Sequence, residues 1–229
     1  SEVLKKIATD KELGYYAKQP HNNPSVLFNG MINAIIPFTI KGVIWYQGEG
    51  NAGRYQNYTK LMNGLIKNWR DEWGLGDFPF YFVQLAPNGS LGQGNGTSQA
   101  FLREAQLKTM LSVKNTGMAV TLDIGSTITN HPPEKLLIGK RLAYWALAKN
   151  YGFNTLPYSG PVYDSMKVIN NKVYVNFRYA RSGVTSYGKP LNGFEIAGKD
   201  KKFYEADASI DPHWSAGLEK RSILILTSK

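Results

Sequence analysis

The chain has 229 residues, 42% of them hydrophobic and 13% aromatic, so it can bury a full core in one large domain or in a domain with an appendage. No run of about eighteen apolar residues is present, which excludes a membrane-spanning helix, and the amphipathic N-terminus does not have the pattern of a signal peptide. Because cysteine is absent, thiol catalysis, zinc–cysteine sites and disulfides are excluded. The formal charge of +10 is compatible with anionic partners, but the basic residues are scattered and form no nucleic-acid-binding motif.

Strand and helix patterns alternate in the first half of the chain. The β-branched and aromatic run at 42–46 predicts a buried strand. Apolar residues at helical spacing predict an amphipathic helix from Tyr55 to Trp73, which Gly74 and Gly76 should end. The continuous apolar run at 80–85 predicts a buried parallel strand.

The same alternation continues to about residue 152. A helix is expected at 98–112, a strand at 117–122, and a second helix that Pro133 opens and Gly152 stops. The residues of this last helix expected to face inward are Ile138, Leu142, Trp145 and Ala146. Strands alternating with helices predict an α/β fold in which helices cover both faces of a sheet.

From Gly160 onward the pattern changes to that of β-structure. Alternating residues at 166–169 and 172–177 flank Asn170 and Asn171, which predicts a hairpin with a two-residue turn. Short strands are expected at 194–197 and 203–206, and 221–227 has the composition of another. We therefore predict two units, an α/β core at 1–157 and a β-rich region at 158–229.

The segment WYQGEGN, at 45–51, is the strongest candidate for a functional site. It follows the first predicted strand, and ligands of open α/β sheets bind at such strand ends. Gly48 and Gly50 allow the backbone to approach a ligand closely, while the side chains of Gln47 and Asn51 can donate hydrogen bonds. An ordinary glycine-rich turn is the alternative.

This segment resembles the WYQGESN block of the sialate O-acetylesterase family, within the SGNH (GDSL-like) hydrolases. Further stretches resemble the same family in the same order, across roughly residues 25–206. They are LFNGMI at 27–32, FTIKGVI at 38–44, VQLAP at 83–87, LREAQ at 102–106, LDIG at 122–125 and HPP at 131–133.

The resemblance implies an SGNH-hydrolase-like three-layer αβα core with a mostly parallel sheet, incomplete at its N-terminus, plus a small C-terminal β-region. It also implies a carbohydrate O-acetylesterase that cleaves acetyl esters of sialic acid or another sugar by serine acyl transfer, without a metal or cofactor. A periplasmic or secreted location is expected from the family alone. The expected partner is the acetylated sugar or sialic acid, and neither nucleic acid nor a membrane is expected.

His131 is the candidate general base, and a helix-capping or solvent-exposed histidine is the alternative role. In the family, a carboxylate two residues before this histidine orients the imidazole, but that position is Thr129 here. Asp123, at the end of a predicted strand, is the candidate substitute, and a capping or turn hydrogen bond is its alternative role.

The best oxyanion donors in the chain are the Gln47 side chain and the Gly48 amide. Glu49 is expected to bind backbone amides or to pair with Arg103, with a general acid as the alternative. Gly50 stands where the family has serine. Arg103 forms either a helical ion pair or a contact with a sugar carboxylate. The glycine-rich stretch at 88–97 is a lid over the site or a plain surface loop.

No serine of the chain has the GQSN-like context in which the family carries its nucleophile. We therefore expect the C-terminal portion of a longer esterase, inactive alone, whose serine lies in an N-terminal segment. Two alternatives stay open. One is an acetylxylan esterase, since the same fold serves different glycans. The other is a non-catalytic carbohydrate-binding or interaction homologue.

Overall fold

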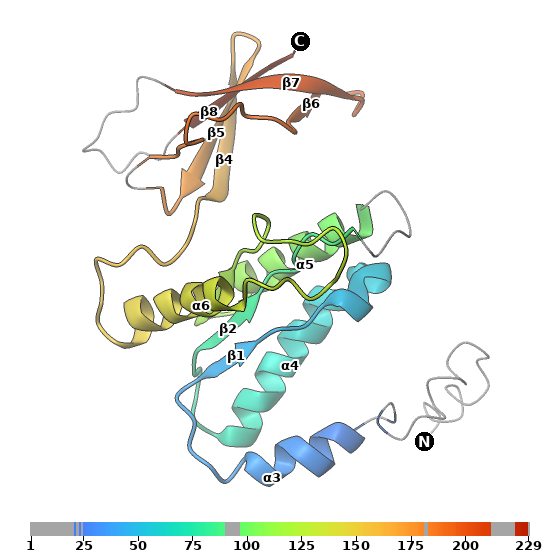
Figure 1. The fold of residues 1–229 in the computed structure, drawn as a ribbon, viewed down its shortest axis with the longest axis vertical. Helices are drawn as coiled ribbons and strands as arrows, with labels where there is room; N and C mark the ends of the chain where they lie inside the picture. Colours follow the sequence, from blue (N-terminus) through green and yellow to red (C-terminus); the bar gives the residue numbers. More distant parts are fainter. Residues whose placement is uncertain are drawn as a thin grey trace, which may run out of the picture.

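A parallel sheet of three strands forms the centre of the first half of the chain (Figure 1). The computed structural model describes residues 21, 23, 25–89, 97–180, 183–211 and 223–228. The strand order is β1-β2-β3, and the bounds are Val43–Trp45 for β1, Phe80–Val83 for β2 and Thr116–Ala119 for β3. The crossover between β2 and β3 carries a helix, as parallel strands require.

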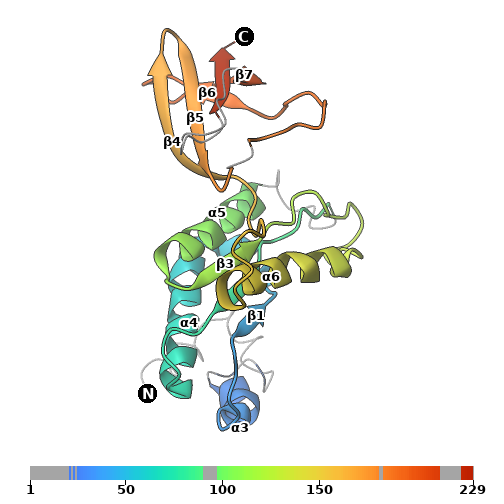
Figure 2. The same ribbon diagram turned by 90° about the vertical axis from the view of Figure 1, so that its left-hand side faces the viewer.

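Helices cover both faces of this sheet, and Figure 2 shows α4 and α6 on opposite sides of the strands. Helices α4 (Tyr58–Trp73) and α5 (Thr97–Ser112) pack against the face that carries Phe80 and Phe82. Helix α6 (Lys135–Asn150) packs against the other face, which carries Tyr81 and Val83. The predicted αβα arrangement with a parallel sheet is confirmed.

The elements agree with the sequence predictions except at their ends. A 3-10 segment, η3 (Glu49–Asn57), precedes α4, so the prediction that this helix begins at Tyr55 is wrong by three residues. Gly74 ends α4 in the left-handed conformation, with φ 61°, as predicted. Strand β2 stops before Leu85, because the Leu85 amide donates to the side chain of Gln106 instead of to a neighbouring strand.

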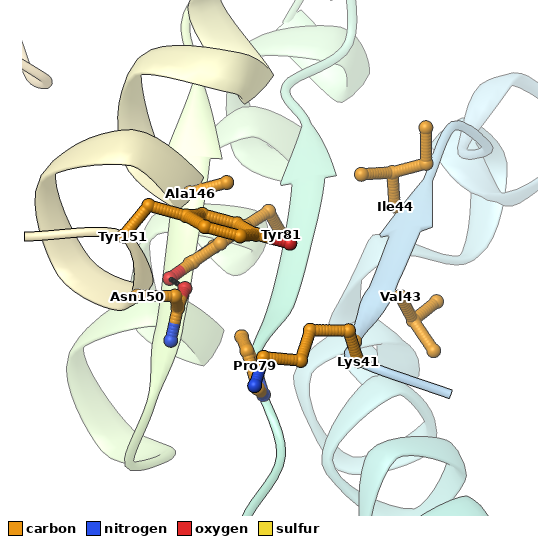
Figure 3. A pocket seen from close by; sticks show the side chains of 9 residues that line it. Lys41, Val43, Ile44, Pro79, Tyr81, Ala146, Asn150 and Tyr151 are labelled. Carbon is orange, nitrogen blue, oxygen red and sulfur yellow. Dashed lines mark hydrogen bonds between the residues drawn. The ribbon is translucent and has the colours of Figure 1, made fainter. Parts of the chain in front are cut away.

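Strand β1 is less buried than its composition predicts. Ile44 is 71% exposed although its register partner Tyr81 is buried. The reason is that β1 is the edge strand, and α6 packs over β2 and β3 rather than over β1. A cavity of about 180 Å³ lies there, with residues of α6 on one side and of β1 on the other (Figure 3).

A short helical stretch precedes β1. It comprises the π-helical turn η2 (Phe28–Ile32) and α3 (Asn33–Ile35), and neither contains a buried residue. Figure 1 shows α3 at the end of the molecule opposite the C-terminal strands.

The C-terminal region forms a five-stranded antiparallel sheet in the order β4-β5-β8-β7-β6. The strands are β4 (Val162–Ile169), β5 (Lys172–Arg178), β6 (Glu195–Ala197), β7 (Phe203–Ile210) and β8 (Ile223–Ser228). Asn170 and Asn171 join β4 to β5 with φ values of 47° and 64°, the positive angles that a two-residue hairpin turn needs. The division at 157/158 into two units stays a prediction.

Candidate active site

The carboxyl ends of the three parallel strands meet at one edge of the sheet. The register aligns Trp45 with Phe82, and Phe82 with Met118, so the loops that follow β1, β2 and β3 leave together. The ammonium group of Lys135, at the start of α6, lies 4.6 Å from the centre of the Tyr46 ring. The segment at 45–51 and the loop that carries His131 therefore reach the same edge.

Gln106 of α5 joins two of these loops. Its side chain is completely buried. Its Oε1 accepts a hydrogen bond of 2.8 Å from the Leu85 amide, and its Nε2 donates to the carbonyls of Val83 at 3.2 Å and Gln47 at 3.4 Å. The backbone after β1 is thereby fixed relative to the backbone after β2.

The side chains of Gln47 and Asn51 form a hydrogen-bonded pair. Gln47 Nε2 donates to Asn51 Oδ1 at 2.6 Å, while the Tyr58 hydroxyl lies 3.4 Å from Gln47 Oε1 and 3.2 Å from the Gln47 carbonyl. Burial raises the pKa of Tyr58, so its hydroxyl stays a donor at neutral pH. Because Asn51 accepts through its oxygen, its amide nitrogen keeps both N–H groups for another acceptor.

The two glycines of the segment have different surroundings. Gly48 is buried, and a Cβ there would lie 3.2 Å from Gln106 Nε2 and 3.4 Å from a methyl of Leu102. The chain therefore approaches α5 as closely as a glycine permits. Gly50 is exposed, and a Cβ at that position would meet nothing within 4 Å.

A cavity of about 310 Å³ lies beside the amide pair. Gln47 and Asn51 form part of its wall together with Tyr58, and α4 supplies Leu61 and Leu65. Of the described residues, those that line it do not include His131 or Arg103. The structure thus brings the two amides to one cavity, whereas His131, Asp123 and Arg103 are not among the described residues that line it.

His131 is exposed, and its backbone N–H donates to the Thr129 hydroxyl at 3.1 Å. The carboxylate of Asp123 is held by Arg141 of α6 in a two-pronged ion pair, with N–O distances of 2.7 and 2.6 Å. This hydrogen bonding lowers the pKa of Asp123, so the group is ionised at neutral pH. Each oxygen keeps a second lone pair for another donor.

Arg103 lies one turn before Gln106 on α5, and the two therefore share a face of the helix. Its guanidinium has a buried Nη1 that no described residue hydrogen-bonds, and burial lowers the pKa of the group. The neighbouring Glu104 pairs with Lys108 at 2.8 Å. Within the described residues no ion pair joins Glu49 to Arg103, so the binding of backbone amides and the general-acid role stay the predictions for Glu49.

Comparison with known proteins identifies the family. The family described as "Carbohydrate esterase, sialic acid-specific acetylesterase" matches residues 16–147, more than half of the chain. The sialate O-acetylesterases of Mus musculus and Homo sapiens are each 30% identical to it, over 211 and 206 residues. The crystal structure of a carbohydrate acetylesterase from Xanthomonas citri superposes with a TM-score of 0.77 at 36% identity and covers 92% of the chain.

The chain belongs to the family of sialic acid-specific acetylesterases. It spans only part of its relatives: 36% of the mouse protein, 37% of the human protein and 48% of the Xanthomonas citri chain. The predicted family and fold class are therefore confirmed, whereas the roles of the individual site residues stay predictions.

Three further observations concern the part of the chain that the structure describes. Residues 90–96 of the expected lid lie outside the described part of the chain. The residues that the structure describes contain no group of three or more His, Cys, Asp or Glu side chains able to hold a metal ion. They also contain no helix of the length and apolarity needed to cross a membrane.

The sequence analysis missed Gln106, the residue that joins the loops after β1 and β2. The sequence could have indicated this role through helical spacing, because Gln106 lies one turn from Leu102 and from Thr109, both of which are buried on the inner face of α5. A polar side chain at such a core position needs partners, and backbone groups supply them here.

Replacing Gln106 by leucine should lower the free energy of unfolding by about 2 to 4 kcal/mol. The change leaves the buried Leu85 amide and the Val83 carbonyl without this partner, and each unsatisfied group costs about 1–3 kcal/mol, whereas the Gln47 carbonyl keeps the Tyr58 hydroxyl. Urea unfolding followed by circular dichroism measures the loss, with exposed Gln56→Leu as the matched control. If the two variants have the same urea midpoint, Gln106 does not hold the loops after β1 and β2 together as described.

Proposed function

We propose that the protein hydrolyses acetyl esters of sialic acid and that this chain supplies the general base and the oxyanion donors. The observation that supports this most directly is the Gln47–Asn51 pair, fixed by Tyr58 and Gln106 beside a cavity at the strand ends. Preorganised amide donors at such a position suit the negative charge that develops on an ester carbonyl oxygen. Family membership supports the same chemistry.

In the proposed mechanism a serine hydroxyl attacks the acetyl carbonyl while His131 accepts its proton. The tetrahedral oxyanion receives hydrogen bonds from the Gly48 amide and the amide side chains of Gln47 and Asn51. His131 then returns the proton to the departing sugar oxygen, which leaves an acetylated serine. A water molecule, deprotonated by His131, releases acetate and restores the serine.

Asp123 is the proposed carboxylate that supports the imidazolium of His131. Arg141 already neutralises the charge of Asp123. The carboxylate would therefore orient the His131 imidazole by accepting a hydrogen bond through a remaining lone pair. Thr129, where the resemblance leads one to expect a carboxylate, uses its hydroxyl to accept from the His131 backbone. Glu49 and Gly50 complete the loop, without a direct catalytic step assigned to either.

The serine is proposed to come from a segment outside these 229 residues. Two observations support this proposal. Among the described strands none pairs with the outer edge of β1, where Ile44 stands exposed next to a cavity (Figure 3). The relatives are also at least twice as long as the part that the chain matches. A further parallel strand at this edge would end beside Gln47, and the 229 residues alone should release no acetate.

Arg103 is the proposed partner of the sugar carboxylate. Its Nη1 is buried and no described residue hydrogen-bonds it, and a guanidinium can bind a carboxylate through two parallel hydrogen bonds. This feature favours sialic acid over the neutral sugars of an acetylated xylan.

Replacing Arg103 by glutamine should lower kcat/KM for an O-acetylated sialic acid by about 10- to 100-fold, since a hydrogen bond to a charged group contributes about 1.5–3 kcal/mol. Hydrolysis of p-nitrophenyl acetate, which has no carboxylate, should change less than about twofold because it lacks that interaction. Acetate release by the protein that carries both this chain and the serine segment measures both rates. Exposed Arg54→Gln is the matched control.

Equal losses on the two substrates would contradict a carboxylate-binding role for Arg103. Faster release of acetate from acetylated xylan than from the sialic acid ester would point to an acetylxylan esterase instead.

A non-catalytic carbohydrate-binding homologue is the second candidate. The observation that favours it is the ion pair of Asp123 with Arg141, together with Thr129 in place of a carboxylate. Sugar binding by the serine-containing protein with no acetate release from any ester would support this candidate.

A further inference from the structure

A further cavity lies at the C-terminal end of α6, away from the strand ends that carry the amide pair. It has a volume of about 530 Å³, within the range of about 300–1,000 Å³ typical of ligand pockets. Its lining includes Lys149, Asn154, Leu156, Tyr158, Ser159 and Tyr179. Lys149 lies at the C-terminal end of α6, whereas His131 precedes its first turn, so the length of a 16-residue helix, roughly 24 Å, separates them.

Two tyrosines from different parts of the chain meet at this cavity. Tyr158 follows α6 and Tyr179 follows β5, and their ring centres are 5.5 Å apart. Both rings contact buried Trp145, at 4.7 and 6.3 Å, and the Trp145 indole N–H donates to the Met118 carbonyl at 3.1 Å. The aromatic wall is therefore held by the core of the parallel sheet.

The backbone of Tyr179 is unusual. Its φ is 59°, in the left-handed region that bulky side chains rarely adopt. Such conformations cost free energy and cluster at binding sites. The side chain is 42% exposed, so burial of the ring in the core does not account for this conformation.

The polar groups around the cavity favour an anion. The Lys149 ammonium lies 4.4 Å from the centre of the Tyr158 ring, and the described residues that line the cavity include no Asp or Glu. Asn154 and Ser159 add an amide and a hydroxyl, groups that hydrogen-bond sugar hydroxyls.

We propose that this cavity is a second, non-hydrolytic binding site for a sugar ring that carries a carboxylate. The ring lies against Tyr179 and Tyr158, its carboxylate pairs with Lys149, and its hydroxyls contact Asn154 and Ser159. The choice of a carboxylated sugar rests on the proposed function, since a glycan that carries more than one sialic acid has such a ring besides the one that is deacetylated. The site would hold one part of the glycan while the ester lies at the strand ends.

Titration calorimetry of the 229-residue chain with N-acetylneuraminic acid tests this proposal, because this sugar carries no O-acetyl ester to hydrolyse. We expect saturable binding that Tyr179→Ala and Lys149→Gln each weaken at least tenfold. The matched control is Tyr204→Ala, an exposed tyrosine of β7, which should not change the affinity, and Arg103→Gln is measured alongside to detect sugar bound at the strand ends. The neutral sugar N-acetylmannosamine should bind at least tenfold more weakly.

No measurable binding, or binding that both cavity variants leave unchanged, would overturn the proposal. Equal affinity for the neutral sugar would overturn the assignment of a carboxylate ligand. Loss of binding in Arg103→Gln would place the sugar at the strand ends and not in this cavity. Since no hydrolysis is measured, failure of the esterase proposal leaves this result interpretable, and circular dichroism of the variants confirms that they fold.

Discussion

Replacing His131 by alanine should lower kcat for acetate release by about 10²- to 10⁴-fold, the usual contribution of a general base. The variant keeps its fold, because the His131 side chain is exposed and the described contact of this residue is made by its backbone. KM should change little, since the imidazole acts on the serine proton and not on the sugar. The rate is measured with an O-acetylated sialic acid, on the protein that carries both this chain and the serine segment.

Exposed His21→Ala is the matched control and should retain full activity. Added imidazole should restore part of the rate of His131→Ala, because a free base can occupy the space of the lost side chain. Unchanged hydrolysis in His131→Ala would show that another group removes the serine proton.

Replacing Gly117 by alanine should lower the free energy of unfolding by about 3 kcal/mol, the upper end of the usual range for overpacking a core. Gly117 is buried in β3. A Cβ there would lie 2.5 Å from Cε3 of Trp145 and 2.8 Å from Cδ1 of Tyr81, closer than real Cβ atoms come to their neighbours. Both rings belong to the core between the sheet and α6. The clash with the added methyl group can therefore be removed only if that helix is displaced.

Gly139→Ala is the matched control, because it makes the same chemical change at a helical position with open space within 4 Å. It should raise the stability by about 0.8–1.0 kcal/mol, the difference in helix propensity between the two residues. The two alanine variants therefore shift the urea midpoint in opposite directions. If Gly117→Ala lowers the free energy of unfolding by less than a typical surface mutation does, β3 and α6 are not packed as described.

Local patterns were enough to predict most of the elements. Helical spacing predicted α4 and α6, and a buried apolar run predicted β2, because these features depend on side chains close together in the sequence. The Asn170–Asn171 turn was predicted for the same reason, since asparagine tolerates the positive φ that the hairpin needs. Resemblance to a family supplied the fold class and the esterase chemistry.

Features that depend on contacts between distant segments were not predictable in this way. Composition gave no sign that α6 leaves Ile44 uncovered, because exposure of an edge strand depends on what packs beside it. The sequence did not indicate which partners the charged groups of Asp123 and Glu104 have. In the structure Asp123 pairs with Arg141, and Glu104 pairs with Lys108. The carbonyls that Gln106 binds belong to β2 and to the loop after β1, so its role follows only from the assembled sheet.

The open edge of β1 also affects how the chain behaves at high concentration. An unpaired strand edge offers free backbone groups to any other strand, and natural proteins protect such edges with charge, proline or short length. Strand β1 is protected by its length of three residues and by Lys41 just before it, while exposed Ile44 adds an apolar contact. Self-association through this edge should therefore compete with pairing to the proposed serine-bearing strand, and whichever strand pairs first excludes the other.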